Sequence, residues 1–281
     1  MFGDLSRINT NLQSMDALRN LNVTNQEMGL RQLRLATGSR LNRAEDDSAS
    51  YTISTKLEAR VRGQAQALSN IGDAKSMLTV AESTMTTIMD ILQTMKEKAV
   101  QSSNDTMGTA ERGDIRSNIS ALRTEINEML DDTTFNGVAL FSSSGNTSFT
   151  FQVNSENGDT MDVSLTSISN DSLGVTTTAI AAMTNSSGSQ TFLSTVDSAI
   201  ATIADRLGDI GDYQKRLTFK QDQLSVSMNN NEAARSRIAD ADFAKEQMEI
   251  AKLQILQQTG VSSLAQANSA PQSILSLVGG G

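Results

Sequence analysis

Acidic and basic side chains crowd one short stretch of the sequence, TGSRLNRAEDDSASY. Within this stretch, three consecutive acids, Glu45–Asp47, follow Arg40 and Arg43. Adjacent carboxylates could hold a divalent cation, or could serve as a general acid and a general base. The stretch has no phosphate-binding or nucleophile motif nearby, however, and it lacks ligands that would converge on a metal ion.

The composition narrows the possible chemistry further. The chain has no His and no Cys, so the usual zinc sites, histidine-based triads and thiol nucleophiles are excluded. Carboxylate, Ser, Thr, Lys and Tyr side chains remain, but no set of general acid, base and nucleophile can be assembled from them. We therefore expect no enzymatic activity, no metal site and no cofactor.

A joint between two helices accounts better for the acidic stretch. Gly38 tolerates the left-handed geometry of a C-terminal cap, so it ends the preceding helix. The two arginines then lie near the negative end of that helix. Asp46 and Asp47 lie at the positive start of the next helix, where carboxylates cap free backbone N–H groups. The predicted joint residues are Gly38, Arg40, Asn42, Arg43, Asp46 and Asp47.

Length and composition indicate a helical protein. The 281 residues suffice for one to three domains with a sizeable core. There is no Trp and a single Pro, aromatic residues make up 4%, and the hydrophobic residues are mainly Leu, Ile, Val, Ala and Met. This composition suits long helices that pack side by side through small and aliphatic side chains.

Charge and hydropathy argue against two classes of partner. A net charge of −9 argues against nucleic acid, because binding to a phosphate backbone depends on concentrated Lys and Arg. No stretch approaches the length of an apolar membrane span, so we expect no membrane insertion. The opening residues MFGDL lack a basic start followed by an apolar run, so we expect no secretory signal peptide.

Helical periodicity dominates the first half of the chain. Apolar residues at steps of three and four predict a first helix over about residues 5–36, with a stop at Thr37-Gly38. A longer pattern without a slip predicts a helix over residues 48–102, which would be roughly 80 Å long and needs a partner helix along its whole length. A third helix is predicted over residues 109–132.

A change of composition after the third helix marks a small β region. Phe135-Asn136-Gly137-Val138 leads into sequence rich in Ser, Thr, Asn and Gly that continues to about residue 190. Within it, apolar residues alternate with polar ones over residues 149–153 and 161–165, and Asn157-Gly158 lies between the two runs. This pattern predicts a β-hairpin.

Helical periodicity then returns for the rest of the chain. It predicts a helix over residues 193–230, which the cluster Asn229-Asn230-Asn231 should interrupt. A final helix is predicted over about residues 232–267, with apolar residues on more than one face. We expect Pro271 to close or kink this helix before an apolar tail.

The two ends of the chain are the least self-sufficient parts of this pattern. Each is a single helix with apolar surface, and the simplest burial pairs the first helix with the last. The other helices would form a separate bundle, capped by the hairpin region. Two helices cannot cover several apolar faces, so the pair should bury itself against copies of itself. The predicted fold class is mainly α: a long antiparallel helical bundle or coiled coil, a small β-hairpin region, and a paired N- and C-terminal helix domain.

Several motifs, in the right order at both ends, resemble the bacterial flagellin family. The resemblance covers nearly the whole chain and points to a short form with little or no variable outer domain. Agreement over several separated runs is strong, because chance rarely produces it. The motifs are Ile8–Asn11, Thr37–Asp47 and Phe135–Gly137 at the N-terminal end, and Ala234–Phe243 and Gln266–Leu277 at the C-terminal end.

The resemblance implies a structural subunit that polymerises into the helical flagellar filament used for motility. It implies an inner core domain, D0, in residues 1–44 and 236–281, whose helices are mobile in the free subunit and order on assembly. The bundle domain, D1, then takes residues 45–190, with the β region at about 135–190, and residues 191–235. The implied filament-core contacts are Leu5, Ile8, Leu12, Met15, Met248, Ile250, Leu253, Ile255, Leu256, Leu264, Ile274, Leu275 and Leu277.

The resemblance also implies a location and a set of partners. Subunits of this family are exported unfolded through the flagellar type III apparatus, without a cleaved signal, and end in the filament outside the cell. The implied partners are copies of the chain itself, the export apparatus, an export chaperone, and the filament cap and junction proteins.

One segment of the second helix resembles the segment that the flagellin-sensing Toll-like receptor reads in some flagellins. Thr94 and Lys96 stand where that pattern has arginines, and Lys98 replaces a leucine. Because Arg and Lys are not equivalent in bidentate contacts, we expect weakened receptor recognition. The receptor-facing residues would be Gln93, Thr94, Lys96, Glu97, Lys98 and Gln101.

Two alternative functions share part of this pattern. A hook-filament junction protein would carry both terminal motifs, but the length, Phe135–Gly137 and the Pro271-Gln272 tail favour flagellin. A cytoplasmic coiled-coil signalling rod would explain the long helical periodicity. It would not need a hairpin region or single apolar helices at both ends.

Overall fold

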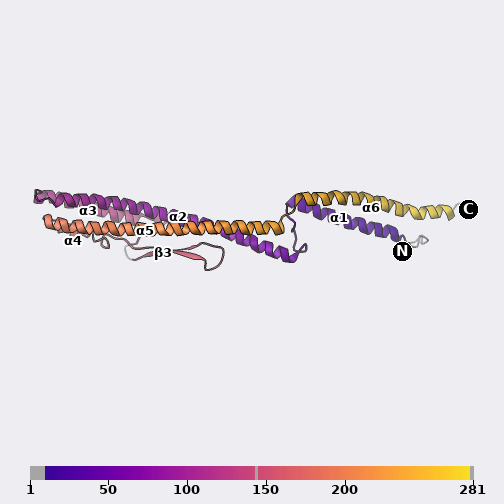
Figure 1. The fold of residues 1–281 in the computed structure, drawn as a ribbon, viewed down its shortest axis with the longest axis horizontal. Coiled ribbons are helices and arrows are strands. Elements are labelled where there is room, and N and C mark those ends of the chain that lie inside the picture. Colours follow the sequence, from indigo (N-terminus) through magenta and orange to yellow (C-terminus); the bar gives the residue numbers. More distant parts are fainter. Residues whose placement is uncertain (1–9, 143–144, 279–281) are drawn as a thin grey trace. The chain divides into compact units, whose positions relative to one another are not determined.

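The computed structural model of the chain describes residues 10–142 and 145–278, with side chains described up to residue 269 (Figure 1). The predicted mainly α fold class is confirmed. The structure consists mostly of long helices, and two small antiparallel strand pairs lie between α3 and α4 in the sequence. The helices are α1 (Leu12–Thr37), α2 (Ser48–Ser102), α3 (Thr109–Asp132), α4 (Thr177–Ala181), α5 (Ser186–Ala239) and α6 (Phe243–Val278). The strands are β1 (Thr134–Phe135), β2 (Val138–Ala139), β3 (Thr147–Gln152) and β4 (Thr160–Leu165).

The described residues divide into two compact units. The terminal unit consists of the described residues up to 59 together with those from 230 onward. The bundle unit consists of the described residues between 60 and 229. Both divisions fall inside long helices, so α2 and α5 each contribute to both units.

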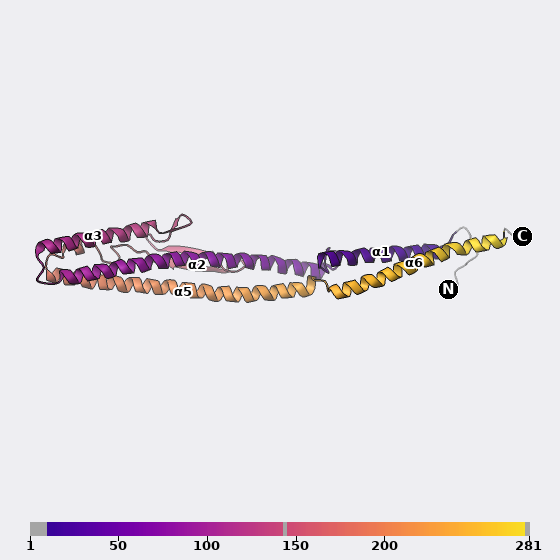
Figure 2. The same cartoon turned by 90° about the horizontal axis from the view of Figure 1, so that it is seen from above.

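The terminal unit is built on the antiparallel pair of α1 and α6, which lie side by side in both cartoon views (Figure 1, Figure 2). The antiparallel order is clear from the contacts: Arg31 bonds to Glu246 near one end of the pair, and Ser14 bonds to Asn268 near the other. The predicted pairing of the first helix with the last is therefore confirmed.

A single asparagine fixes the start of α1. Thr10 and Asn11 are not helical, and the Asn11 side-chain oxygen accepts the N–H of Ser14 at 3.0 Å, as an N-cap does. The helix that the structure describes thus begins at Leu12, and the predicted portion over residues 5–9 lies outside the described part of the chain.

The predicted closing of the last helix at Pro271 is wrong, because α6 continues through this residue to Val278. The alternative, a kink at Pro271, stays a prediction. Proline has no N–H, so the carbonyl four residues earlier, that of Ala267, loses its helical partner. The Asn11 side-chain amide donates to that carbonyl at 2.7 Å. Asn11 therefore caps one helix and satisfies the backbone group that the proline leaves open in the other.

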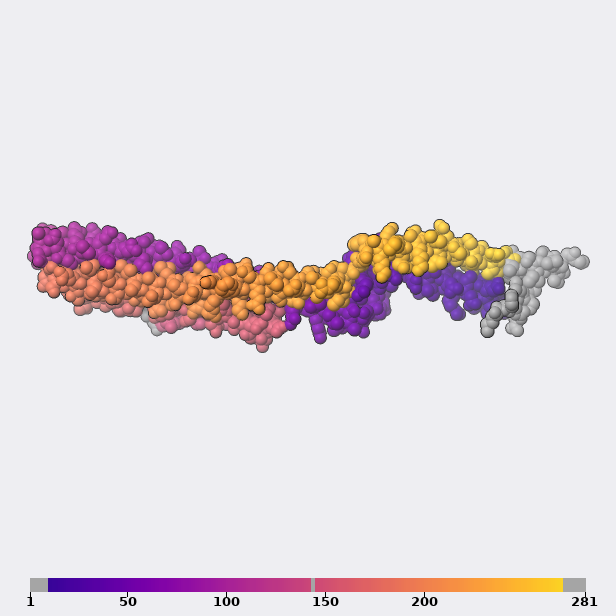
Figure 3. Space-filling view, viewed as in Figure 1, coloured from indigo at the N-terminus to yellow at the C-terminus, as the bar shows by residue number. Residues whose placement is uncertain are grey.

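The bundle unit has a continuous apolar core between α2, α3 and α5, and Figure 3 shows α5 running unbroken along its visible face. The fully buried side chains follow a strict heptad repeat, which is the spacing of helices that supercoil around each other. On α2 they include Ile71, Leu78, Leu92 and Ala99, and on α5 they include Val196, Ile203 and Leu217.

The predicted hairpin is confirmed as β3 and β4, which pair antiparallel with Phe149 opposite Val163 and Phe151 opposite Met161. Alternate residues of β4 are buried in the bundle core, as the alternation predicted. The smaller pair β1–β2 was missed. It turns at Asn136-Gly137, where both residues have positive φ, the conformation that a two-residue hairpin requires.

The predicted interruption at Asn229-Asn230-Asn231 is also wrong, because α5 runs unbroken from Ser186 to Ala239. Asparagine costs a helix only about 0.7 kcal/mol or less per residue relative to alanine. The flanking turns hold the helix, since Leu224 is buried on one side and Arg235 pairs with Glu232 at 2.6 Å on the other. The break comes instead at residues 240–242.

Candidate assembly surface and interhelical joint

The loop between α1 and α2 is closed by backbone contacts with the loop between α5 and α6. Gly38 has φ +68°, the left-handed cap that ends α1, and its carbonyl accepts the N–H of Ala241 at 2.8 Å. Ser39 forms an antiparallel bridge with Asp240. The joint is therefore held between two helix ends that lie far apart in the sequence.

Asp47 caps the start of α2. Its Oδ1 accepts the N–H groups of Ala49 and Ser50 at 3.1 Å each. The hydrogen bonds from Ser50, the bond from Ala49 and the nearby charge of Arg40 together hold the pKa of this carboxyl below its ordinary value. A lowered pKa means that the ionised carboxylate stabilises the helix start.

Asp46 acts within the loop and not at the start of α2. Its Oδ2 accepts the N–H groups of Asn42 and Arg43 at 3.1 Å each. The Asn42 side chain in turn donates to the carbonyl of Ser39 at 3.0 Å. These bonds fold the loop onto itself, so the two neighbouring aspartates have different roles.

The two arginines of the joint were expected near the end of α1, but their side chains bond to other groups. The Arg40 guanidinium donates to the carbonyl of Ile238 at 2.8 Å, so it satisfies the last turn of α5. Arg43 pairs with Glu45 at 3.0 Å on the exposed surface, where such pairs contribute little. Among the described residues, no three acidic side chains lie close enough together to hold a metal ion.

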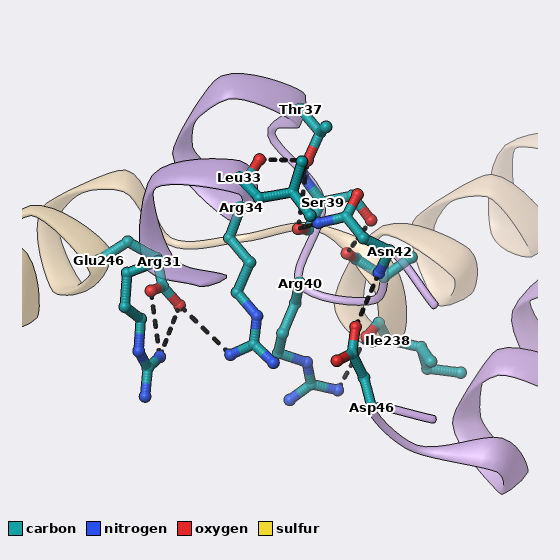
Figure 4. A network of polar contacts seen from close by, with 11 residues as sticks. Arg31, Leu33, Arg34, Thr37, Ser39, Arg40, Asn42, Asp46, Ile238 and Glu246 are labelled. Atoms are coloured by element: carbon teal, nitrogen blue, oxygen red, sulfur yellow. Dashed lines mark hydrogen bonds and ion pairs between the residues drawn. The ribbon is translucent and has the colours of Figure 1, made fainter. Parts of the chain in front are cut away.

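A buried carboxylate on the inner face of α6 was missed by the sequence analysis. Glu246 is 5% exposed, and both of its oxygens accept from Arg31, at 3.0 and 3.1 Å (Figure 4). Arg34 points at the same carboxylate from 4.0 Å. The sequence did hold a signal for this ion pair. Glu246 has the same helical phase as Ile250 and Leu253 on α6, and Arg31 and Arg34 lie three residues apart on α1, the predicted partner helix.

The contacts between α1 and α6 identify the face on which they pack, here called the seam. On α6 the seam contains Glu246, Gln257 and Gly260, each of which faces a residue of α1. Ile250 and Leu253 share this phase and are buried, at 6% and 4% exposed. These two residues were expected to contact other subunits, but they are already covered within the terminal unit.

Opposite the seam, α6 exposes a second apolar face. At about 100° per residue, Met248 and Ile255 lie on the far side of the helix from Glu246 and Leu253. They are 67% and 65% exposed. Other residues of the two helices were also expected to make filament-core contacts. Of these, Leu12, Met15 and Leu256 are exposed, and Leu264 is half-buried. Leu5 and Ile8, and the side chains of Ile274, Leu275 and Leu277, lie outside the described part.

The first helix repeats this arrangement. Its seam contains Ser14, Leu21 and Arg31, whereas Leu12 and Val23 lie away from the seam and are exposed. Leu18, Val23, Phe243 and Val261 were missed as exposed apolar residues of the pair. Exposed apolar surface of this extent on a helix pair marks an interaction surface.

The sequence also carries family signatures at both ends. The bacterial flagellin N-terminal helical region matches residues 8–146, and the bacterial flagellin C-terminal helical region matches residues 193–278. The chain belongs to the bacterial flagellin family. Flagellins are structural proteins of the flagellar filament, so the chain is a filament subunit of the motility organelle.

Flagellins of known identity match along almost their whole length. The chain is 34% identical to the flagellin of Halalkalibacterium halodurans over 273 residues, which cover 96% of this chain and 99% of that protein. It is 34% identical to flagellin FljK of Caulobacter vibrioides over 280 residues, 97% of this chain and 98% of that protein. Since the relatives lack a large extra region, this flagellin is of the short form, as expected.

A solved structure supports the fold. A flagellar hook-associated protein from Vibrio parahaemolyticus matches with a TM-score of 0.60 and 16% identity, over 69% of this chain and 100% of that one. This likeness concerns the fold alone. The near full-length relatives are flagellins, so the junction protein and the signalling rod are not favoured. No helix in the described part is long and apolar enough to span a membrane.

The segment compared with the receptor pattern lies on α2 in the bundle unit. Gln93, Thr94, Glu97 and Gln101 are exposed, whereas Lys96 and Lys98 are half-buried. The Lys96 ammonium pairs with Asp197 of α5 at 2.7 Å, and the Thr94 hydroxyl donates to the carbonyl of Asp90 at 3.0 Å. Two of the departures from the pattern thus already have partners within this flagellin.

Proposed function

We propose that this flagellin polymerises through the exposed apolar faces of α1 and α6, with the joint loop holding the end of α1 against the end of α5. The observation that carries the proposal is the pair of faces opposite the seam, where Met248, Ile255 and Leu12 are exposed. Burying such a side chain gains about 1.5–3 kcal/mol, and the seam cannot bury them. Copies of the same chain can.

In this proposal the inner domain D0 takes residues 1–44 and 236–281, and the bundle domain D1 takes residues 45–235. The joint residues then have a structural role at the D0–D1 boundary, where Asp47 starts α2 and Arg40 completes α5. No catalytic role is assigned to any residue.

The partners beyond the filament follow from family membership. We propose that the chain is carried by an export chaperone to the flagellar type III apparatus, leaves the cell without a cleaved signal, and takes its place in the extracellular filament. The filament cap and the junction proteins would meet it at the two ends of the polymer.

Receptor recognition is a separate part of the proposal. We propose that the flagellin-sensing Toll-like receptor recognises this chain weakly, because Lys96 is held by Asp197 and Thr94 cannot form an arginine's bidentate contacts. Purified monomer should activate receptor-bearing reporter cells poorly. Full activation at nanomolar monomer would contradict this.

The assembly proposal is tested by negative-stain electron microscopy. The intact chain, given short flagellar seeds or a precipitating salt, should form long filaments, whereas a chain lacking residues 1–36 and 240–281 should not.

A sharper test replaces Ile255 with Ser, which should slow elongation by about tenfold or more because a buried apolar contact is lost. The control Val138→Ser changes a residue that is 52% exposed on β2 of the bundle unit, and it should assemble normally. An intact chain that remains monomeric or dimeric under every condition would contradict the proposal.

A further inference from the structure

The methionines of this flagellin divide sharply by exposure. The chain has 13 methionines, of which all but Met1 lie in the part that the structure describes. Among the described ones, Met15 and Met248 are exposed, at 56% and 67%. The remaining described methionines are half-buried or buried. The buried ones, each 4% exposed or less, are Met77, Met85, Met95, Met161 and Met183.

Both exposed methionines lie on the terminal helix pair and away from its seam. On α6, Met248 shares the outer face with Ile255, seven residues on, so the two lie two helical turns apart on one side. On α1, Met15 follows the seam residue Ser14 by one position and therefore points about 100° away from the seam. The rest of the terminal unit leaves both sulfur-bearing side chains open to solvent.

An exposed thioether is open to a defined reaction. Its sulfur lone pair attacks one oxygen of a peroxide, the O–O bond breaks, and the sulfur gains that oxygen as a sulfoxide. With hydrogen peroxide, the departing hydroxide takes up the proton and leaves as water. The sulfur is oxidised by two electrons and the peroxide is reduced by two, so no further reactant is needed.

We propose that Met15 and Met248 are oxidation sites that control whether the free subunit can assemble. The inference rests on the proposed role of the outer faces of α1 and α6 in polymerisation. A sulfoxide places a strong polar group where an apolar contact must form, and burying an unpaired polar group is unfavourable. Assembly in turn covers both sulfurs, so the free subunit is sensitive and the filament is protected.

The experiment treats the purified full-length chain with hydrogen peroxide, maps each methionine by peptide mass spectrometry, and then measures seeded filament growth. Met15 and Met248 should oxidise about tenfold faster than the buried methionines of the bundle unit, since reactivity follows exposure. The oxidised chain should elongate about tenfold more slowly than the untreated chain, because two apolar contacts are lost. In preformed filaments both methionines should be protected.

Three variants separate this effect from general damage. Met15→Leu/Met248→Leu keeps apolar volume, so it should assemble normally and remain competent after peroxide. Met15→Gln/Met248→Gln should assemble poorly without any oxidant. The control Met107→Leu/Met228→Leu removes two half-buried methionines and should stay as peroxide-sensitive as the unmodified chain.

Two results would overturn the proposal. One is equal oxidation of the buried and exposed methionines, and the other is a leucine double variant that loses assembly after peroxide as completely as the unmodified chain. If the untreated chain fails to form filaments at all, the proposed function fails instead, and the peptide map still decides whether these two methionines are the sites.

Discussion

The terminal unit and the bundle unit use similar helices and bury them to very different extents. In the bundle unit, heptad positions of α2 and α5 such as Ile71, Leu92 and Ile203 are completely buried. In the terminal unit, no residue of α1 is buried, and the buried apolar side chains among the described residues of α6 are Ile250 and Leu253. Helical apolar residues therefore form a closed core in the bundle unit, whereas in the terminal unit most of them remain at least partly exposed.

The difference shows how one chain can be folded and still ready to polymerise. A pair of helices buries too little surface to be stable alone, so its order depends on further contacts. When those contacts come from copies of the same chain, the stability of the terminal unit depends on assembly. The bundle unit needs no such contribution, because its core is closed.

The largest effect should come from the bundle core. Leu92→Ala removes a fully buried side chain and should lower the free energy of unfolding by about 2–5 kcal/mol. The matched change Ile255→Ala on the terminal unit removes a side chain that is 65% exposed and should shift the monomer by about 0.5 kcal/mol or less. Urea titration followed by circular dichroism of the monomer measures both. Equal losses would mean that the two units are buried alike.

The buried carboxylate of the terminal unit should give the next largest effect. Glu246→Gln leaves Arg31 and Arg34 without their shared anion and should cost the helix pair about 1.5–3 kcal/mol, the range for hydrogen bonds to charged groups. Glu249→Gln is the control, because its partner Lys252 is exposed, Glu249 itself is only half-buried, and such a pair contributes little. Amide hydrogen exchange along α1, measured in assembled filaments, reports the loss. Exchange that is the same in both variants would refute the role of Glu246.

Substitutions of Asn11 should have a smaller effect on stability, which separates into a loss at the start of α1 and a loss near Pro271 of α6. Asn11→Ser keeps an oxygen that can cap α1 but removes the longer side-chain amide N–H that reaches the carbonyl of Ala267, so it should cost about 0.5–1.5 kcal/mol near Pro271 only. Asn11→Ala should lose this bond and also fray the first turn of α1. Exchange of the amides of residues 12–15 and 267–278 separates the two losses. If Asn11→Ser leaves residues 267–278 unchanged, the carbonyl of Ala267 does not depend on Asn11.

The smallest effect concerns the start of α2. The pKa of Asp47 is lowered in the folded chain, so its cap is fully present above the unfolded value of about 3.9 and is lost as the pH falls through the folded value. Amide exchange at Ala49 and Ser50 should therefore be unaffected between neutral pH and about pH 5, and should lose protection in stronger acid. Asp47→Asn, whose side-chain oxygen still accepts, should abolish this pH dependence. A pH dependence that persists in the variant would assign it to another group.

Much of the fold was predictable because periodicity and turn residues act locally. The heptads of α2 fixed both of its ends, Gly38 marked the end of α1, and the alternation around Asn157-Gly158 gave the pairing of β3 with β4. These signals depend on neighbours along the chain, which a sequence displays directly.

The face on which the terminal helices pack was less predictable, because each helix has more than one apolar face. Leu12 and Met15 were expected to make filament-core contacts, and both are exposed, whereas the seam of α1 contains the polar residues Ser14 and Arg31. Which face becomes internal depends on the partner helix. A pattern of apolar residues in one helix does not contain that information.

The polar contacts of the joint were predictable only in part. An aspartate cap at the start of α2 follows from local rules, and Asp47 occupies it. The bonds from Arg40 to Ile238 and from Asn11 to Ala267 join positions about two hundred residues or more apart, so no local pattern could indicate them. The same holds for Glu246, whose partners lie on the opposite helix.

Hydrogen exchange of the full-length chain, measured as free subunit and as filament, reports directly whether assembly stabilises the terminal unit. The amides of α1 and α6 should gain about 100-fold or more in protection on assembly, because local stability there depends on contacts between copies. The amides of residues 71–99 in α2 should change little. Terminal helices that are already as protected in the free subunit as the bundle helices, or that gain nothing in the filament, would contradict the claim that assembly completes the terminal unit.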